Sequence, residues 1–368
     1  MNAKMKYIQK PMILLVALAL LGGLPACRNE PWGAAGDFPS PKSYFEELGI
    51  HSPGPGADAA GIAATSITSG GFSIASVDGA RATEEDPLAY SGQPMTFVFS
   101  YSISVTPDDA DFNTLFLCFL DGVLCPFTVG EETAPRESYV QYISGGGTWG
   151  FTFTLDPKEL SFSETSRLRF VAVGNFDTRA DTAFNIWPIT WESWVSFDLC
   201  PAEGLAPIAP PDPQPVLSVP DAADGRLVDQ DVLSEEANLG GGFNRIYVEG
   251  AMEVGGFYMT FSRSGALRMM ASLPAGRYRS SVFVEGGLVP AFSGLPYLDW
   301  ESPAESAGMG NGTVLDIQLD SGVLPEDGLC NIFAVHIPMD DFPDPLTSLI
   351  AMMSGDAVTP ILTLDIVP

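Results

Sequence analysis

The sequence predicts an all-β fold made of two tandem copies of one β-sandwich domain, and three observations carry this prediction. The 368 residues include 38 glycines and 31 prolines, a density of turn-forming residues that favours many short strands over long helices. Apolar residues make up 46% of the chain and include 23 phenylalanines, which is enough material for packed cores. Eleven residues that begin at residue 70 recur from residue 241 with six identities, which indicates an internal duplication.

The duplication continues along the chain, and from Met95 onward the matched residues are separated by a constant number of positions. Residues 70–80 match residues 241–251, and after a longer loop in the first copy Met95 matches Met259 at an offset of 164. The same offset pairs Phe119 with Phe283, Asp121 with Glu285, Gly122 with Gly286, Leu124 with Leu288, Pro126 with Pro290 and Leu155 with Leu319. Residues 198–201 also resemble residues 365–368. Such an ordered series of matches predicts two copies of one domain.

Alternating apolar residues predict the strands of each copy. Phe97, Phe99, Tyr101 and Ile103 alternate with smaller or polar residues, which is the pattern of a half-buried strand. In the first copy the expected strands lie near 72–77, 94–104, 114–120, 123–129, 149–155, 167–173 and 194–200. About seven strands in roughly 130 residues is the size of an immunoglobulin-like sandwich.

Changes in composition set the domain boundaries. The predicted segments are a leader at 1–26, a tether at 27–69, the first sandwich at 70–200, a linker at 201–240 and the second sandwich at 241–368. The linker is rich in proline, with seven prolines in residues 201–220, and is expected to be stiff and extended. Because such a spacer permits few shared contacts, the two copies are expected to fold independently.

The N-terminus combines a basic segment, a short apolar run and a cysteine. Three lysines and no acidic residue precede the apolar run 12–21, and Leu24-Pro25-Ala26-Cys27 follows it. This arrangement resembles the bacterial lipoprotein signal peptide, or lipobox. The resemblance implies that Cys27 receives a diacylglycerol, that the leader is removed before it and that the protein is exported and stays on a membrane, at the cell surface or on a periplasmic face. The alternatives are a plain signal peptide and a membrane-spanning helix, and ten apolar residues are too few for a span of about 20.

Net charge excludes one class of partner. Removal of residues 1–26 takes away three lysines and changes the formal net charge from −29 to −32. A surface this acidic repels nucleic acid and anionic lipid headgroups, so contact with a membrane is expected through the lipid alone.

Four cysteines remain beside Cys27. The Asp121-Gly122 turn predicts a two-residue hairpin in which Cys118 faces Cys125, within reach of a disulfide. The second copy has Val282 and Val289 at these positions, so two buried thiols that serve as core remain the alternative. Zinc has no support because no Cys-x-x-Cys pair occurs, and the redox state of the remaining cysteines, Cys200 and Cys330, is not predicted.

Evidence for catalysis is weak, and no enzyme is predicted. His51 lies in the tether and His336 in an expected strand, and neither has an evident catalytic partner. The chain has no G-x-S-x-G elbow, H-E-x-x-H motif or phosphate-binding glycine loop. No cofactor is therefore expected, with calcium in acidic loops as the one exception.

Two features are candidates for binding. Acidic loops at 108–111, 221–231 and 340–344 offer oxygen ligands that suit calcium, although none matches an EF-hand and such loops are commonly solvated surface. Trp187 and Trp191 precede the last strand of the first copy, and the second copy has no tryptophan at residues 339–360. They are interpreted either as an aromatic platform for a sugar ring or hydrophobic partner, or as ordinary loop packing. Trp194 aligns with Ile361 and is expected in the core.

The predicted function is that of a lipid-anchored, non-catalytic binding or adhesion module that displays loops to a glycan or surface protein. A structural subunit of a fimbria-like appendage is the alternative, because a lipoprotein with two tandem sandwiches resembles in architecture the fimbrial subunits of some gut and oral bacteria. In those proteins a strand is donated between subunits. Here residues 361–367 match an internal strand of the first copy, so they are expected to belong to their own domain. A surface hydrolase accessory ranks third.

Overall fold

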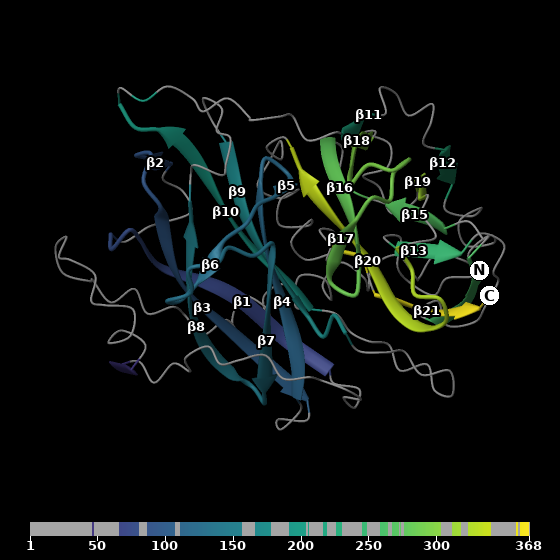
Figure 1. Ribbon diagram of the computed structural model, residues 1–368, viewed down its shortest axis with the longest axis horizontal. Helices are drawn as coiled ribbons and strands as arrows, with labels where there is room; N and C mark the ends of the chain where they lie inside the picture. Colours follow the sequence, from purple (N-terminus) through teal and green to yellow (C-terminus); the bar gives the residue numbers. More distant parts are fainter. Residues whose placement is uncertain are drawn as a thin grey trace, which may run out of the picture. The chain divides into compact units, whose positions relative to one another are not determined.

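The computed structural model is all-β, and its described residues form 21 strands in four sheets (Figure 1). The structure describes residues 46–47, 66–80, 87–106, 111–156, 166–177, 191–203, 205, 216–218, 226–229, 245–248, 258–263, 267–271, 273, 276–302, 311–317, 323–339, 358–359 and 361–367. These belong to one compact unit, Pro39–Pro368. Among them no helix has the length and apolar character needed to span a membrane.

The first half of the chain forms a sandwich of two sheets. One sheet has the order β1-β3-β8-β6, and the other has the order β2-β10-β9-β4-β5 with β7 also paired to β4. The strands are β1 (Ser66–Val77), β2 (Leu88–Tyr90), β3 (Met95–Thr106), β4 (Asp111–Leu120), β5 (Val123–Leu124), β6 (Thr128–Val129), β7 (Ser138–Ser144), β8 (Gly147–Leu155), β9 (Ser166–Gly174) and β10 (Trp191–Pro201). Neighbouring strands are antiparallel except β2 and β10, which run parallel.

The second half also forms two sheets. Their orders are β11-β18-β16-β20-β21-β14, with β17 also paired to β16, and β12-β19-β15-β13. The strands are β11 (Val216–Ser218), β12 (Arg226–Asp229), β13 (Arg245–Val248), β14 (Tyr258–Ser262), β15 (Leu267–Ala271), β16 (Gly276–Val284), β17 (Gly287–Val289), β18 (Tyr297–Ser302), β19 (Asn311–Ile317), β20 (Gly328–Pro338) and β21 (Leu362–Val367). The predicted all-β class with several sheets is therefore confirmed.

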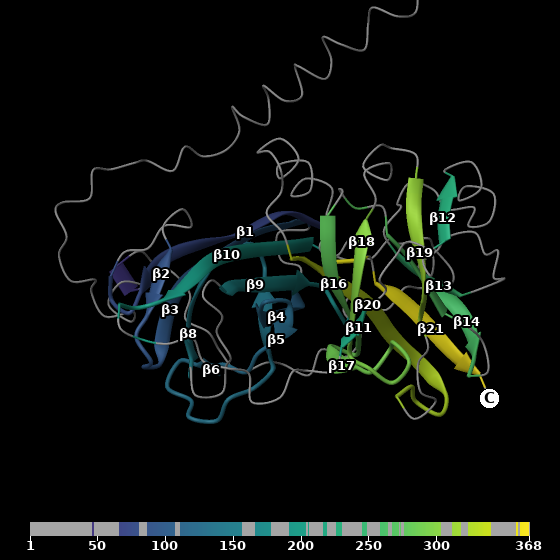
Figure 2. The ribbon, with the colours of Figure 1, turned by 90° about the horizontal axis from the view of Figure 1, so that it is seen from above.

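Each half has its own core between its two sheets. In the first half, Phe97, Phe99, Tyr101 and Ile103 of β3 are all buried, as their alternation predicts. The Phe99 ring meets the Phe170 ring of the opposite sheet with centroids 4.7 Å apart, so the two sheets pack face to face (Figure 2). In the second half, the core joins residues of β13 and β15 to residues of β16, β20 and β21.

One expected strand is divided in the structure, and two observed strands of the first half, β2 and β7, were not expected. The strand predicted at 123–129 is divided into β5, which pairs with β4, and β6, which pairs with β8 of the other sheet. Pro126 lies between them and has no N–H to continue a ladder, so the chain crosses from one sheet to the other there. The strand β7 was not predicted, because its buried positions include the polar Gln141 among Tyr139 and Ile143.

Part of the strand pairing follows the repeat. Cys118 is paired with Phe170 across β4 and β9, and the residues 164 positions later, Val282 and Ala334, are paired across β16 and β20. The match of Met95 to Met259 has no such counterpart, since β3 lies between β1 and β8 whereas β14 pairs in parallel with β21. In its sheet β14 is the edge strand that pairs in parallel with β21, as β2 is the edge strand that pairs in parallel with β10 in the first half. The duplication itself therefore stays a prediction.

Candidate functional site

A third apolar cluster joins the two halves and is called the junction cluster here. Its buried members come from both halves: Leu115, Leu117, Phe119, Leu124, Val171, Val173, Phe176, Phe283, Tyr297, Phe333, Val335, Ile337, Val358 and Ile361. Within it the rings of Phe119 and Phe283 meet edge to face with centroids 6.5 Å apart. The two halves therefore share a buried apolar cluster, which the proline-rich linker did not predict.

The physical reason is that the central strands of both halves are apolar on both faces. In β4 every residue from Phe112 to Leu120 is buried, and β20 is buried from Cys330 to Pro338. One face of each strand supplies its own core and the other supplies the junction cluster. A strand buried on both faces is a continuous apolar run and lacks the period of two. The continuous apolar runs at 115–120 and 332–335 are the sequence pattern from which burial on both faces could have been predicted.

Two glycines at hairpin turns bring the halves into close contact. Gly122 has φ +75°, and a Cβ atom there would lie 3.0 Å from side-chain atoms of Arg279 and Met339. Gly286 has φ +77°, and a Cβ atom there would lie 2.8 Å from Cε2 of Phe176. Both positions need glycine for the left-handed backbone and for the space.

The contacts of these glycines are reciprocal under the repeat. Gly122 and Gly286 are 164 residues apart, and so are Leu115, which borders the Gly286 position, and Arg279, which borders Gly122. Phe119 and Phe283 are separated by the same number and contact each other. A reciprocal pattern of this kind is typical of an interface with two-fold symmetry, here within a single chain.

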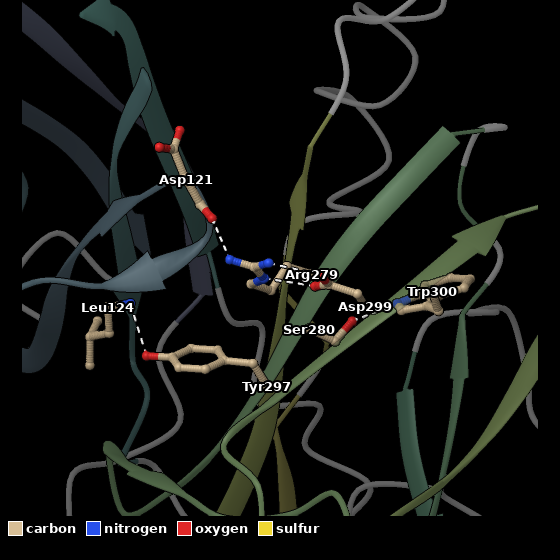
Figure 3. A network of polar contacts seen from close by, with 7 residues as sticks. All are labelled: Asp121, Leu124, Arg279, Ser280, Tyr297, Asp299 and Trp300. Atoms are coloured by element: carbon tan, nitrogen blue, oxygen red, sulfur yellow. Dashed lines mark hydrogen bonds and ion pairs between the residues drawn. The ribbon is translucent and has the colours of Figure 1, made fainter. Parts of the chain in front are cut away.

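Polar contacts also cross the junction (Figure 3). The Arg279 guanidinium binds both carboxylate oxygens of Asp299, at 2.7 and 2.8 Å, and also donates to the carbonyl oxygen of Asp121 at 2.8 Å. The Leu124 N–H donates to the Tyr297 hydroxyl at 3.0 Å, and burial of this hydroxyl raises the pKa of Tyr297 to about 12. Both contacts end on the β4–β5 hairpin, so this hairpin is one part of the first half that the second half binds by polar groups.

A second polar set lies on the other hairpin. Asn331 donates through Nδ2 to the carbonyl oxygen of Phe176 at 3.0 Å, and it accepts through Oδ1 from the Thr363 hydroxyl at 2.9 Å. The Asn331 N–H donates to a carboxylate oxygen of Glu285, which stands at the β16–β17 turn with φ 51°. A buried amide satisfied in this way fixes the position of the strands it joins.

Trp194 packs against the junction cluster and is not fully buried, whereas its alignment with Ile361 predicts a core residue. It is half-buried, and the guanidinium carbon of Arg169 lies 4.4 Å from its ring centroid. Arg169 is 3% exposed, and its Nε–H donates to the Ser196 hydroxyl at 2.8 Å. Burial, with the nearby Arg167, lowers the pKa of Arg169 to about 9. The ring thus compensates in part for the desolvation of this cation.

Cys118 and Cys125 face each other as the hairpin register predicts. The Cys125 N–H donates to the Cys118 carbonyl oxygen at 2.8 Å, and the two sulfur atoms lie 3.3 Å apart as thiols. Both residues are buried in the first core. Burial raises the pKa of the Cys118 thiol well above its ordinary value, and the neighbouring Cys125 adds to this rise.

The other predicted sites are mostly outside the described residues. These include Cys27, His51, Trp187 and most of the three acidic loops, while Trp191 is placed only as backbone in β10. Asp111 begins β4, and hydrogen bonds from Ser144 and Tyr142 lower its pKa. Among the described residues no group of three His, Cys, Asp or Glu side chains could hold a metal ion.

His336 lies in the second core. Its Nδ1 is hydrogen-bonded to the Ser280 hydroxyl at 2.7 Å. This hydroxyl also accepts from the Trp300 Nε1–H at 2.8 Å, a contact drawn in Figure 3. The imidazole is fully buried, and burial lowers the pKa of His336 to about 3. The ring is therefore neutral at physiological pH and has no route to solvent in this arrangement.

The sequence matches no protein-family model and no curated protein. Among solved structures, the chain is similar to the E. coli chaperone DraB, with 9% identity, a TM-score of 0.19 and coverage of 80% of this chain and 99% of that one. It is also similar to the CupB6 tip adhesin of Pseudomonas aeruginosa, with 10% identity, a TM-score of 0.16 and coverage of 83% and 99%. A third similarity is to latent PorU of Porphyromonas gingivalis, with 11% identity, a TM-score of 0.23 and coverage of 81% and 34%. Likenesses at these TM-scores carry no inference about function.

Proposed function

We propose that this protein is an exported bacterial lipoprotein that is held on a membrane through Cys27 and acts as a non-catalytic binding or adhesion module. The observation that carries the proposal is the order of basic residues, apolar run and Leu24-Pro25-Ala26-Cys27 at the N-terminus. Two or three acyl chains on one cysteine bury enough methylene groups for stable anchoring, whereas one chain is marginal.

The described fold supports a display role. Sandwiches carry binding loops on a stable scaffold, and the junction cluster adds a third apolar cluster that contains residues of both halves. The acidic net charge disfavours nucleic acid as a partner, and a glycan or a surface protein stays the proposed partner. Calcium in the acidic loops stays part of the proposal, and so does an aromatic platform at Trp187 and Trp191.

A structural subunit of a surface appendage is the second candidate. One observation bears on it: β21 pairs with β20 on one side and with β14 on the other. The last strand therefore lies inside its own sheet and is not a spare strand for donation. This favours the binding module over polymerisation through the C-terminal strand.

The anchor is tested by replacing Cys27 with alanine in the full chain. We expect the wild type to remain in washed membranes and to partition into detergent, and Cys27→Ala to be released. Cys200→Ala is the matched control, because this cysteine is half-buried in β10 and should not affect anchoring. Equal retention of Cys27→Ala would refute the lipid anchor.

The binding role is tested with the soluble form, residues 28–368, against arrays of glycans and of surface proteins. Saturable binding by a defined glycan or protein supports the proposal, and loss of that binding in Trp187→Ala/Trp191→Ala would assign the platform. Concentration-dependent polymers would favour the appendage subunit, and hydrolysis of a polysaccharide or peptide panel would favour an enzyme.

A further inference from the structure

We propose that Cys118 and Cys125 are a covalent modification site, at which a disulfide closes the β4–β5 hairpin and thereby strengthens the hold of the first sandwich on the second. The inference goes beyond the proposed function and does not depend on it. It is carried by the hairpin geometry and by the contacts on the opposite face of the same hairpin.

The hairpin brings the two thiols together. Asp121 and Gly122 have φ 49° and 75°, the backbone of a tight two-residue turn, and Phe119 is paired with Leu124 next to it. The following pair is Cys118 and Cys125, which share a 2.8 Å backbone hydrogen bond and have sulfur atoms 3.3 Å apart. Directly opposed residues in antiparallel strands have Cα atoms about 4.5–5.5 Å apart, within the range that a disulfide spans.

The two faces of this hairpin serve different cores. Cys118 and Cys125 point into the first core, whereas Phe119 and Leu124 belong to the junction cluster. The turn also accepts the Arg279 hydrogen bond at the Asp121 carbonyl, and its return strand donates to Tyr297 (Figure 3). A bond between the sulfurs would therefore fix the strand pair on which the second half rests.

The second hairpin provides an internal comparison. Val282 is paired with Val289 across β16 and β17 at the corresponding register, and both are buried in the second core. Two valines fill this position without a covalent link. Valine is therefore the replacement that we expect the fold to accept at Cys118 and Cys125.

The chemistry is a thiol–disulfide exchange. One thiolate attacks a sulfur of an external disulfide, such as oxidised glutathione, which releases one glutathione thiolate and leaves a mixed disulfide. The second protein thiolate then attacks the protein sulfur of this mixed disulfide and displaces the second glutathione thiolate. The two cysteines lose two protons and two electrons in total, one S–S bond forms between them, and the external disulfide is reduced to two thiols. Since the folded hairpin buries both sulfurs, we expect the exchange to occur while the hairpin is still open, during folding.

The test refolds the full chain carrying Cys27→Ala in oxidised or in reduced glutathione. The protein is then denatured, alkylated and digested, and the peptide that contains both Cys118 and Cys125 is weighed before and after reduction. We expect this peptide to be protected from alkylation until reduction in the oxidised sample. We also expect the oxidised protein to melt on the order of 5 °C higher than the reduced one.

Two further measurements connect the bond to the junction. Hydrogen exchange of the Leu124 amide should be slower by on the order of tenfold in the oxidised protein, while the Val289 amide of the other hairpin should not change. Cys118→Val/Cys125→Val, which copies Val282 and Val289, should fold and lose the redox dependence of both readouts. Alkylation of both thiols after oxidised refolding would overturn the proposal even if this variant fails to fold. Oxidation without any change at Leu124 would overturn the coupling to the junction.

Discussion

The core of the first sandwich is built largely from aromatic rings, whereas the core of the second is built largely from aliphatic side chains. Phe99, Phe153 and Phe170 belong to a network of ring contacts in the first half, with centroids 4.7–5.7 Å apart. The second core contains Met269, Ile332 and Leu364, which have aliphatic side chains. The pair β4 and β9 and the pair β16 and β20 have the same register, so this strand pairing is compatible with an aromatic or an aliphatic core.

The two cores also differ in their buried polar groups. The second core holds His336, Ser280 and Trp300 in one hydrogen-bonded chain. In the first core the hydroxyl of Tyr101 is buried without a hydrogen-bond partner among the described residues. The second core thus contains a buried titratable group, His336, beside its apolar packing.

The largest effect is expected from truncation of an aromatic ring in the first core. Phe99→Ala should lower the free energy of unfolding by about 3–5 kcal/mol, because it removes a fully buried ring and leaves a cavity. Met269→Ala is the counterpart in the second core and should cost about 2–5 kcal/mol. Chemical denaturation measures both. If the halves unfold together through the junction cluster, each variant shifts a single transition; two separate transitions would contradict a stabilising role of this cluster.

The second effect is a pH dependence confined to the second core. Burial lowers the pKa of His336 from 6.5 to about 3, so the unfolded state binds more protons than the folded state between these values. The free energy of unfolding should therefore fall as the pH falls from about 6.5 towards 3, by on the order of a few kcal/mol. Denaturation curves at successive pH values measure this fall.

His336→Asn is the matched variant for this measurement. Asparagine keeps a polar atom near the place of Nδ1, where Ser280 is bound, and does not titrate. The variant should lose stability at neutral pH but show a shallower slope between pH 6.5 and 4. An unchanged slope would assign the acid sensitivity to other groups.

How far the sequence predicted these features depends on the kind of pattern. The period-two alternation at residues 97–103 predicted a half-buried strand, and the Asp121-Gly122 turn predicted the register that places Cys118 opposite Cys125. The sequence did not predict the junction, because a proline-rich linker is typical of separate domains. Continuous apolar runs carry the information for a strand buried on both faces, but they do not say which partner covers the second face.

The third effect concerns the turn glycines at the junction. Gly286→Ala should lower the free energy of unfolding by about 1–3 kcal/mol, because its Cβ would meet the Phe176 ring and its backbone has positive φ. Gly92→Ala is the matched control, since Gly92 has φ +81° but nothing within 4 Å of a Cβ atom. The difference between the two losses in free energy of unfolding measures the cost of crowding between the Cβ atom and the Phe176 ring. Equal losses would show that Phe176 moves away without cost.

The smallest effect distinguishes the polar junction from the first core. Tyr297→Phe removes the hydroxyl that accepts the Leu124 N–H and should cost about 1–2 kcal/mol, because a buried donor is left without its partner. Tyr101→Phe removes a buried hydroxyl that has no hydrogen-bond partner among the described residues, so it should be neutral or slightly stabilising. Paired thermal melts at one pH measure the two changes. A loss of similar size in both would mean that the Tyr297 contact adds nothing specific, and the polar part of the junction would then be a consequence of apolar packing and not a cause of it.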